Sequence, residues 1–330
     1  MARTLHITNG DAVSLGETGL GGQVLAWRDV LHEGPVPAGL SLQQLRPIRA
    51  RFLAELGHRP EPETLASLEQ RDRVLAGFRE SDEVVLWFEH DLYDQLQLIQ
   101  ILDWFASQGD GIHLSLVDSG RYLGPMEPGE LVALYPARVP VTQAQFELAS
   151  RAWRAYSSPD PRVLPRLLRQ DTSALPHLSG ALERHLEQFP AAENGLSRTE
   201  RQILEIAASG VRRLGAIFLA DQDREDRIFM GDLVFNAYVR GLASARVPLL
   251  RISDPGATFH EISIEVTPQG DAVLRAKADH VDLNGIDCWR GGVHLYAGKV
   301  WRRNRPLAGH GPSSWRQVWR WNSLDRCFVN

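Results

Sequence analysis

Three ionisable residues stand in a row where an apolar run of the chain ends: Glu89, His90 and Asp91 follow VVLWF (84–88). A histidine beside carboxylates is the usual apparatus of general acid–base catalysis, because a carboxylate orients the imidazole and raises its basicity. The same residue types also bind divalent metals such as Zn²⁺, Mn²⁺ or Fe²⁺. The spacing is compatible with both chemistries.

Polar residues also follow the other short apolar runs of the first 125 residues. They are Asn9, Gly10 and Asp11 after TLHIT (4–8), Arg28, Asp29, His32 and Glu33 after QVLAW (23–27), and Asp118, Ser119 and Arg121 at the end of IHLSLVDS (112–119). In an open parallel sheet, ligands bind beyond the carboxyl ends of the strands. If these runs are parallel strands, we expect their polar residues to meet at one edge.

The elements that must position these residues read as alternating strands and helices. Helical patterns at about 41–56 and 62–79 lie between the second and third apolar runs, and one at 91–107 lies between the third and fourth. Near-continuous apolar strands separated by helices are typical of a parallel sheet that is covered on both faces. We therefore predict a Rossmann-like α/β domain over residues 1–139.

The predicted site divides by role. The catalytic candidates are His90, Asp91, Glu89, His32 and Glu33. The substrate-binding candidates are Asn9, Asp11, Arg28 and Gln95, and the metal-ligand candidates are His90, Asp91 and Asp11. Metal-assisted hydrolysis of a nucleotide-like or phosphorylated small molecule, with a divalent metal as cofactor, is the most concrete expectation.

Structural roles compete with these assignments. Asp91 stands where a helix begins and is a good N-cap residue. The HEGP stretch from His32 suits an ordinary turn, and Glu89 is compatible with a solvated surface charge. The whole polar group could also be a hydrogen-bonded scaffold. The chain contains no GxGxxG, Walker-type loop, GxSxG or HExxH motif, so none of those mechanisms is supported.

Composition limits the class of protein. Hydrophobic residues make up 43% of the 330 residues and charged residues 23%, which is ordinary for a globular protein. No apolar run approaches the roughly 20 residues that a membrane helix needs, and no secretory signal is recognisable. The two cysteines, Cys288 and Cys327, lie far apart. We expect a cytoplasmic protein without a membrane partner.

The rest of the chain is expected to form three further parts. Residues 140–190 read as a helical segment, and 191–195 as a linker. Residues 196–282 follow a winged-helix-like order, beginning with a capping box at Ser197 and Glu200. The would-be recognition helix, 230–243, is mostly apolar, and 196–282 contain 11 Lys and Arg against 13 Asp and Glu. This balance favours packing or partner contact over nucleic-acid binding.

The last part, 283–330, is basic and rich in tryptophan. It has eight Lys and Arg against two Asp, and it holds five of the nine tryptophans. Because the whole chain carries −5, residues 1–282 carry −11. Interleaved Arg and Trp can bind phosphates and stack on bases, so Trp301, Arg302 and Arg303 are candidates for nucleic-acid contact. They could equally cap a domain, and the tail from 306 is expected to be partly disordered.

Several motifs resemble those of a known family. HITNGD (6–11), LHEGPV (31–36) and WFEHDLYDQLQL (87–98), with the later TPQGDAVL and WRGGVHL, resemble a family of bacterial proteins classed as a domain of unknown function. The resemblance extends to about residue 304 and implies one architecture over that length. It implies no particular activity. The alternative to an enzyme is a nucleic-acid-binding or regulatory protein, with a small-molecule-sensing α/β domain and a winged helix.

Overall fold

The computed structural model describes residues 3–109, 111, 113–253 and 256–303, so the predicted disordered tail lies outside the described residues. The fold is mixed α/β, and the chain divides into two compact units. One comprises residues 1–182 with 291–293, and the other comprises the remainder. The helical segment predicted for 140–190 is thus grouped with the sheet as far as Leu182.

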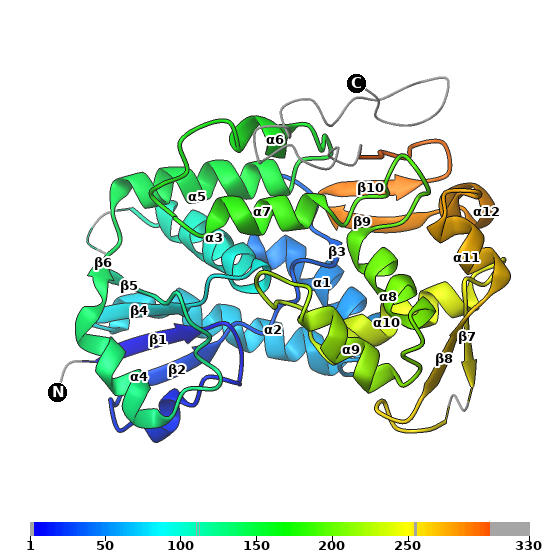
Figure 1. Cartoon of the computed structure of the whole chain (residues 1–330). Helices are drawn as coiled ribbons and strands as arrows, with labels where there is room; N and C mark the ends of the chain where they lie inside the picture. The colour runs from blue at the N-terminus through cyan, green and yellow to red at the C-terminus, as the bar shows by residue number, and fades with distance from the viewer. Residues whose placement is uncertain (1–2, 110, 112, 254–255, 304–330) are drawn as a thin grey trace. The chain divides into compact units, whose positions relative to one another are not determined.

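The first unit is built on a mostly parallel five-stranded sheet with the order β2-β1-β4-β5-β6 (Figure 1). Its strands are β1 (Thr4–Thr8), β2 (Gln23–Ala26), β4 (Glu83–Phe88), β5 (Leu114–Asp118) and β6 (Val139–Pro140). The four predicted strands are present and run parallel. The edge strand β6 pairs antiparallel with β5 and was not predicted. All of β1 and all but the first residue of β4 are buried, which explains their apolar sequences.

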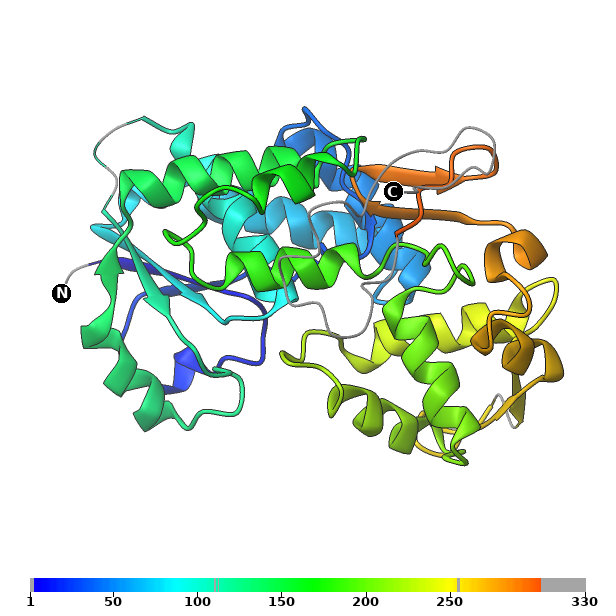
Figure 2. The same ribbon diagram turned by 45° about the horizontal axis from the view of Figure 1, so that its top comes forward.

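Helices cover this sheet and extend the unit. They are α1 (Leu42–Leu56), α2 (Glu61–Ala76), α3 (Leu92–Ala106), α4 (Pro128–Leu134), α5 (Gln143–Tyr156), α6 (Val163–Leu167) and the beginning of α7 (Leu178–Leu186), with short 3-10 turns at Leu15–Glu17, Phe78–Glu80 and Tyr135–Ala137 and a two-residue strand β3 at Gly34–Pro35. The predicted helices 41–56 and 91–107 agree with α1 and α3. Helix α5 runs beside α3 in both views (Figures 1 and 2).

The core of the sheet has two faces because successive strand residues point to opposite sides. Val85, Trp87 and Val117 pack on one face with Leu123 and with Leu131 of α4. The alternate residues of β4 are also buried, and α3 contacts this strand. Both faces are therefore covered, as a parallel sheet requires.

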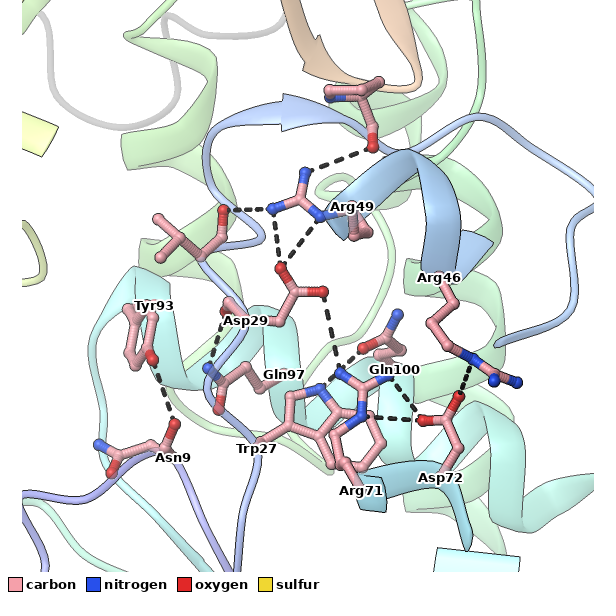
Figure 3. A network of polar contacts seen from close by, with 12 residues as sticks. Asn9, Trp27, Asp29, Arg46, Arg49, Arg71, Asp72, Tyr93, Gln97 and Gln100 are labelled. Atoms are coloured by element: carbon pink, nitrogen blue, oxygen red, sulfur yellow. Dashed lines mark hydrogen bonds and ion pairs between the residues drawn. The ribbon is translucent and has the colours of Figure 1, made fainter. Parts of the chain in front are cut away.

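A buried network around Asp29 ties the loop after β2 to three helices (Figure 3). Arg49 of α1 donates from Nε and Nη2 to the Asp29 carboxylate at 3.0 and 2.8 Å, and to two loop carbonyl oxygens at 2.7 and 2.8 Å. Arg71 of α2 lies 3.9 Å from the second carboxylate oxygen, and Gln97 of α3 donates to the Asp29 carbonyl at 2.9 Å. The charge on Asp29 is thereby neutralised inside the fold.

The second unit contains helices, one antiparallel strand pair and two further strands. They are α8 (Arg198–Ala208), α9 (Leu214–Gln222), α10 (Asp232–Ser244), the antiparallel pair β7 (Leu250–Ser253) and β8 (Ser263–Val266), α11 (Pro268–Leu274), α12 (His280–Asn284), β9 (Asp287–Gly291) and β10 (Val293–Tyr296). Gly291–Val293, where β9 ends and β10 begins, are grouped with the first unit. The predicted capping box is confirmed, because Ser197 Oγ accepts from Glu200 N and the Glu200 side chain accepts from Ser197 N.

The predicted linker at 191–195 is wrong. Asn194 is fully buried, and its Nδ2 donates to the Val273 carbonyl at 3.0 Å. Its own carbonyl accepts from His280 N at 2.8 Å. The polar composition of 191–195 therefore reflects a packed turn, in which the asparagine satisfies backbone groups of other elements.

The Asp29 network yields a stability prediction. Arg49→Ala should lower the free energy of unfolding by about 3–5 kcal/mol, because it leaves a buried carboxylate and two carbonyl groups without their donor. Arg51→Ala is the matched control on the same helix, since the Arg51 side chain is 71% exposed. Urea denaturation followed by tryptophan fluorescence measures both. Equal stabilities of the two variants would contradict the structural role given to Asp29.

Candidate functional site

The sheet order places a topological switch point between β1 and β4. The chain passes from β1 to β2 on one side and later returns to β4 on the other side of β1. Ligands of open α/β sheets usually bind at the carboxyl ends of the strands beside such a switch point. Asn9 follows β1 and Glu89 follows β4, so both predicted residues lie at this switch point.

Three carboxyl groups meet at the end of β4. Glu89, Asp91 and Asp94 are 6%, 3% and 1% exposed. One oxygen of each lies within 4.8 Å of the others. We call these residues the carboxyl triad. Within the described part of the chain, no Arg or Lys forms an ion pair with any of them.

Helix α3 positions two members of the triad. Asp91 is the N-cap, as the structural alternative predicted, and its Oδ1 accepts from Tyr93 N at 2.9 Å and Asp94 N at 3.3 Å. Asp94, in the first turn, accepts from Glu89 N at 2.7 Å through Oδ1 and from Asn9 Nδ2 at 2.8 Å through Oδ2. Asp94 therefore links the ends of β1 and β4.

Glu89 is held from the other side by the segment after β5. Its Oε1 accepts from Leu123 N at 2.7 Å and from Gly124 N at 3.3 Å. Gln95, predicted as a substrate contact, donates from Nε2 to the Glu89 carbonyl at 2.7 Å. Gln95 is thus a positioning residue for Glu89 in this structure.

The environment of the triad favours protonated acids or a bound cation. Burial raises the pKa of Asp91 to about 7, and the neighbouring charge of Glu89 adds to this shift. Burial also raises the pKa of Glu89, although the two backbone donors oppose the change. The pKa of Asp94 is raised well above its ordinary value by burial and by the charges of the other two acids. A bound cation would lower the free-energy cost of ionising these three carboxyl groups at neutral pH.

His90 lies outside the triad. Its ring is 4.8 Å from that of Tyr122 and 5.9 Å from that of His177, measured between centroids. His177 in turn places Nε2 3.4 Å from Oδ1 of Asp118. The ends of β4 and β5 thus carry a second polar group with two histidines and one carboxylate.

The predicted metal ligands are not brought together. Asp11 pairs with Arg28 through bonds of 2.7 and 2.5 Å, at a position where both side chains are about half exposed or more. The described group with ligand spacing is Glu89, Asp91 and Asp94, so only Asp91 of the predicted set belongs to it. The spacing gave a wrong prediction for Asp11 because Arg28, which follows β2, pairs with its carboxylate.

His32 and Glu33 are buried but do not join the triad. The His32 ring packs edge-on against Tyr93 at 5.9 Å, and the Glu33 carbonyl accepts from Arg49. Tyr93 itself donates from its hydroxyl to the Asn9 carbonyl at 3.1 Å (Figure 3). These contacts give the LHEGPV stretch a packing role at the site.

The predicted nucleic-acid contacts are buried. Trp301, Arg302 and Arg303 are 8%, 7% and 6% exposed. Arg302 makes a two-pronged pair with Asp279, and Arg303 donates from Nε to the Phe189 carbonyl at 3.2 Å. The prediction for these three residues is therefore not supported, and the alternative of a domain cap fits their surroundings.

Two residues of the site were missed as functional candidates. Asp94 was not among the predicted site residues, although its spacing of three from Asp91 places it in the first turn of the predicted helix. His177 follows a proline-rich stretch far along the chain and gave no local signal. Only the fold places it beside His90.

Comparisons with known proteins do not identify the chain. No protein-family model matches it, and no curated protein matches it. Across the described residues, no helix is both long and apolar enough to cross a membrane.

The triad yields a pH prediction. In its folded state Asp91 has a pKa of about 7 against an ordinary 3.8, so the folded protein holds the extra proton between these values. The unfolding free energy of the metal-free protein should therefore fall as pH rises from about 4 to about 7. Asp91→Asn should flatten this fall, because asparagine keeps the N-cap without the charge.

The matched variant Asp91→Ala separates the two roles. It should flatten the same pH dependence and also cost about 1 kcal/mol at every pH, because the N-cap is lost. Thermal unfolding in EDTA from pH 4.5 to 8 gives both quantities. A wild-type pH slope unchanged in Asp91→Asn would show that Asp91 titrates normally.

Proposed function

We propose that this protein is a metal-dependent hydrolase whose triad of Glu89, Asp91 and Asp94 binds a divalent cation and whose substrate is a phosphorylated or nucleotide-like molecule. The observation that carries the proposal is the close approach of three buried carboxyl groups without a cationic partner among the described residues. Such an arrangement is unfavourable unless protons or a metal ion offset the charge.

The donor set indicates which cations fit. All three ligands are carboxylates, and the Asn9 side-chain carbonyl, Oδ1, is a buried oxygen without a hydrogen-bond partner among the described residues. Oxygen ligands suit Mg²⁺, Mn²⁺ or Ca²⁺ better than Zn²⁺. The cation would activate water and neutralise charge on a phosphoryl group.

His90 remains the proposed acid–base residue. It lies next to the triad in sequence and beside His177, which Asp118 can orient through the contact at 3.4 Å. A carboxylate–histidine contact supports proton transfer because it fixes the imidazole and stabilises its charged form. We assign proton donation to the leaving group to His90 and its orientation to the surrounding rings.

We also propose that the first unit contains a Rossmann-like domain. The parallel pairing of β1, β2, β4 and β5 and the switch point between β1 and β4 support this assignment. The succession α8, α9, α10, β7 and β8 supports a winged-helix-like domain. Its slight acidity and the burial of Arg302 favour a packing or partner-binding role for it over nucleic-acid binding.

Manganese titration of the metal-free protein tests the triad. Mn²⁺ binding followed by electron paramagnetic resonance should reveal one site in the wild type. Glu89→Gln should weaken it by at least tenfold, because it removes one charged ligand. Asp11→Asn is the matched control, since Asp11 lies at the same sheet edge outside the triad, and its affinity should equal that of the wild type.

The variant His90→Ala separates metal binding from proton transfer. We expect it to retain Mn²⁺ binding and the melting temperature, and to lose hydrolysis by a factor of about 10²–10⁴. Absence of Mn²⁺, Mg²⁺ and Ca²⁺ binding in the wild type would refute the metal site. Loss of Mn²⁺ binding in His90→Ala would instead support the prediction that His90 is a metal ligand.

A further inference from the structure

A cavity of about 520 Å³ lies in the first unit, between β2 and the helices α1 and α2. Its lining includes Gly10 and Asp11, which follow β1, and Tyr93 of α3. Gly10 directly follows Asn9, which donates to Asp94, and Tyr93 lies between the two aspartates of the triad. The cavity and the triad therefore share the segment that ends β1 and the first turn of α3. Its volume is in the usual range for a small-molecule site.

The charge of the lining is predominantly positive. Three arginines, Arg28, Arg59 and Arg71, line the cavity against the single carboxylate of Asp11. Arg59 is exposed and forms no ion pair with a carboxylate of the described residues. The hydrogen bond from Arg28 is the main cause that lowers the pKa of the Asp11 carboxyl. The positive charge of Arg59 lowers the same pKa further, so Arg59 acts electrostatically on Asp11.

Arg28 is held in an unusual backbone conformation at the cavity. Its φ of +54° lies in the left-handed region that residues other than glycine rarely adopt, and its amide donates to the Asn9 carbonyl at 3.2 Å. The Asp11 carboxylate takes the Nε and Nη2 donors of its side chain. Nη1 has no acceptor in the described structure, so one edge of the guanidinium remains available to an oxyanion.

Arg71 forms a rigid part of the wall. It is 6% exposed, its guanidinium lies 4.2 Å over the Trp27 ring, and Asp72 pairs with it at 2.8 Å. Leu53, Leu68 and Val74 add apolar surface beside these polar groups. A cavity lined by both cationic groups and apolar side chains matches a molecule with an anionic group and a less polar body.

We propose that this cavity binds the phosphate-bearing part of a small phosphorylated molecule, with Arg28 and Arg59 contacting the phosphate. The proposal rests on the proposed hydrolase function, because it identifies where the substrate is held beside the triad. Guanidinium groups bind phosphate through paired, charge-assisted hydrogen bonds, which explains the use of arginine at both positions. The apolar wall would accommodate the remainder of the molecule.

Isothermal titration calorimetry of the full chain in EDTA at low salt tests the cavity without the metal site. The probes are inorganic phosphate, ribose 5-phosphate, adenosine 5′-monophosphate and adenosine. At least one phosphorylated probe should bind more tightly than adenosine. Arg59→Gln should weaken that probe by about tenfold or more, because a charge-assisted hydrogen bond is lost.

Matched variants make the result specific. Arg51→Gln removes an exposed arginine of α1 outside the cavity and should leave binding unchanged. Arg28→Gln should weaken the same probe as Arg59→Gln does. The idea is overturned if no phosphorylated probe binds, if adenosine binds equally well, or if Arg28→Gln and Arg59→Gln bind like the wild type. Glu89→Gln should bind the phosphorylated probe like the wild type but bind Mn²⁺ more weakly. A wrong assignment of the cavity would therefore affect probe binding, and a wrong assignment of the metal site would affect Mn²⁺ binding.

Discussion

The buried ion pair between Asp29 and Arg49 is the constraint on which the first unit depends. Removing two charges from water is costly. The pair persists because Arg49 also donates to two backbone carbonyls and the second carboxylate oxygen of Asp29 lies near Arg71. These bonds join the loop after β2 to α1, and Arg71 and Gln97 extend the network to α2 and α3. The network thereby fixes Trp27 and Arg71, which line the cavity, and α3, which positions Asp91 and Asp94 of the triad.

Two groups of buried acids in the same unit differ in one respect. Asp29 has arginines as partners, whereas the triad has backbone amides and the side chain of Asn9. Amide donors compensate only part of the desolvation of three carboxyl groups, so their pKa values rise. A purely structural group of acids would be more stable with an arginine or lysine partner, as Asp29 has. The triad has no such partner among the described residues, and this is why we connect the triad with a metal and with function.

In the second unit, the number of basic residues in a segment did not predict whether those residues are exposed. The basic, tryptophan-rich segment suggested nucleic-acid contact, but Arg302 lies against Asp279 and Trp301 is buried. A similar pair joins Arg184 and Glu225 at 2.7 Å, both nearly buried. Composition records how many charges a segment carries. It does not record how many are neutralised inside the fold, where an arginine can bury its stem and satisfy its guanidinium.

Local sequence determined the strands β1, β4 and β5, the helix α3 with its cap at Asp91, and the capping box at Ser197, because these depend on neighbours along the chain. It also indicated that polar residues gather at the carboxyl edge of the sheet. Which of them meet was decided by tertiary structure. The contact of Asn9 with Asp94 spans 85 residues, the Leu123 amide reaches Glu89 across 34, and His177 joins His90 from a separate segment. Strand order and loop packing set these distances, and no local pattern of residues encodes them.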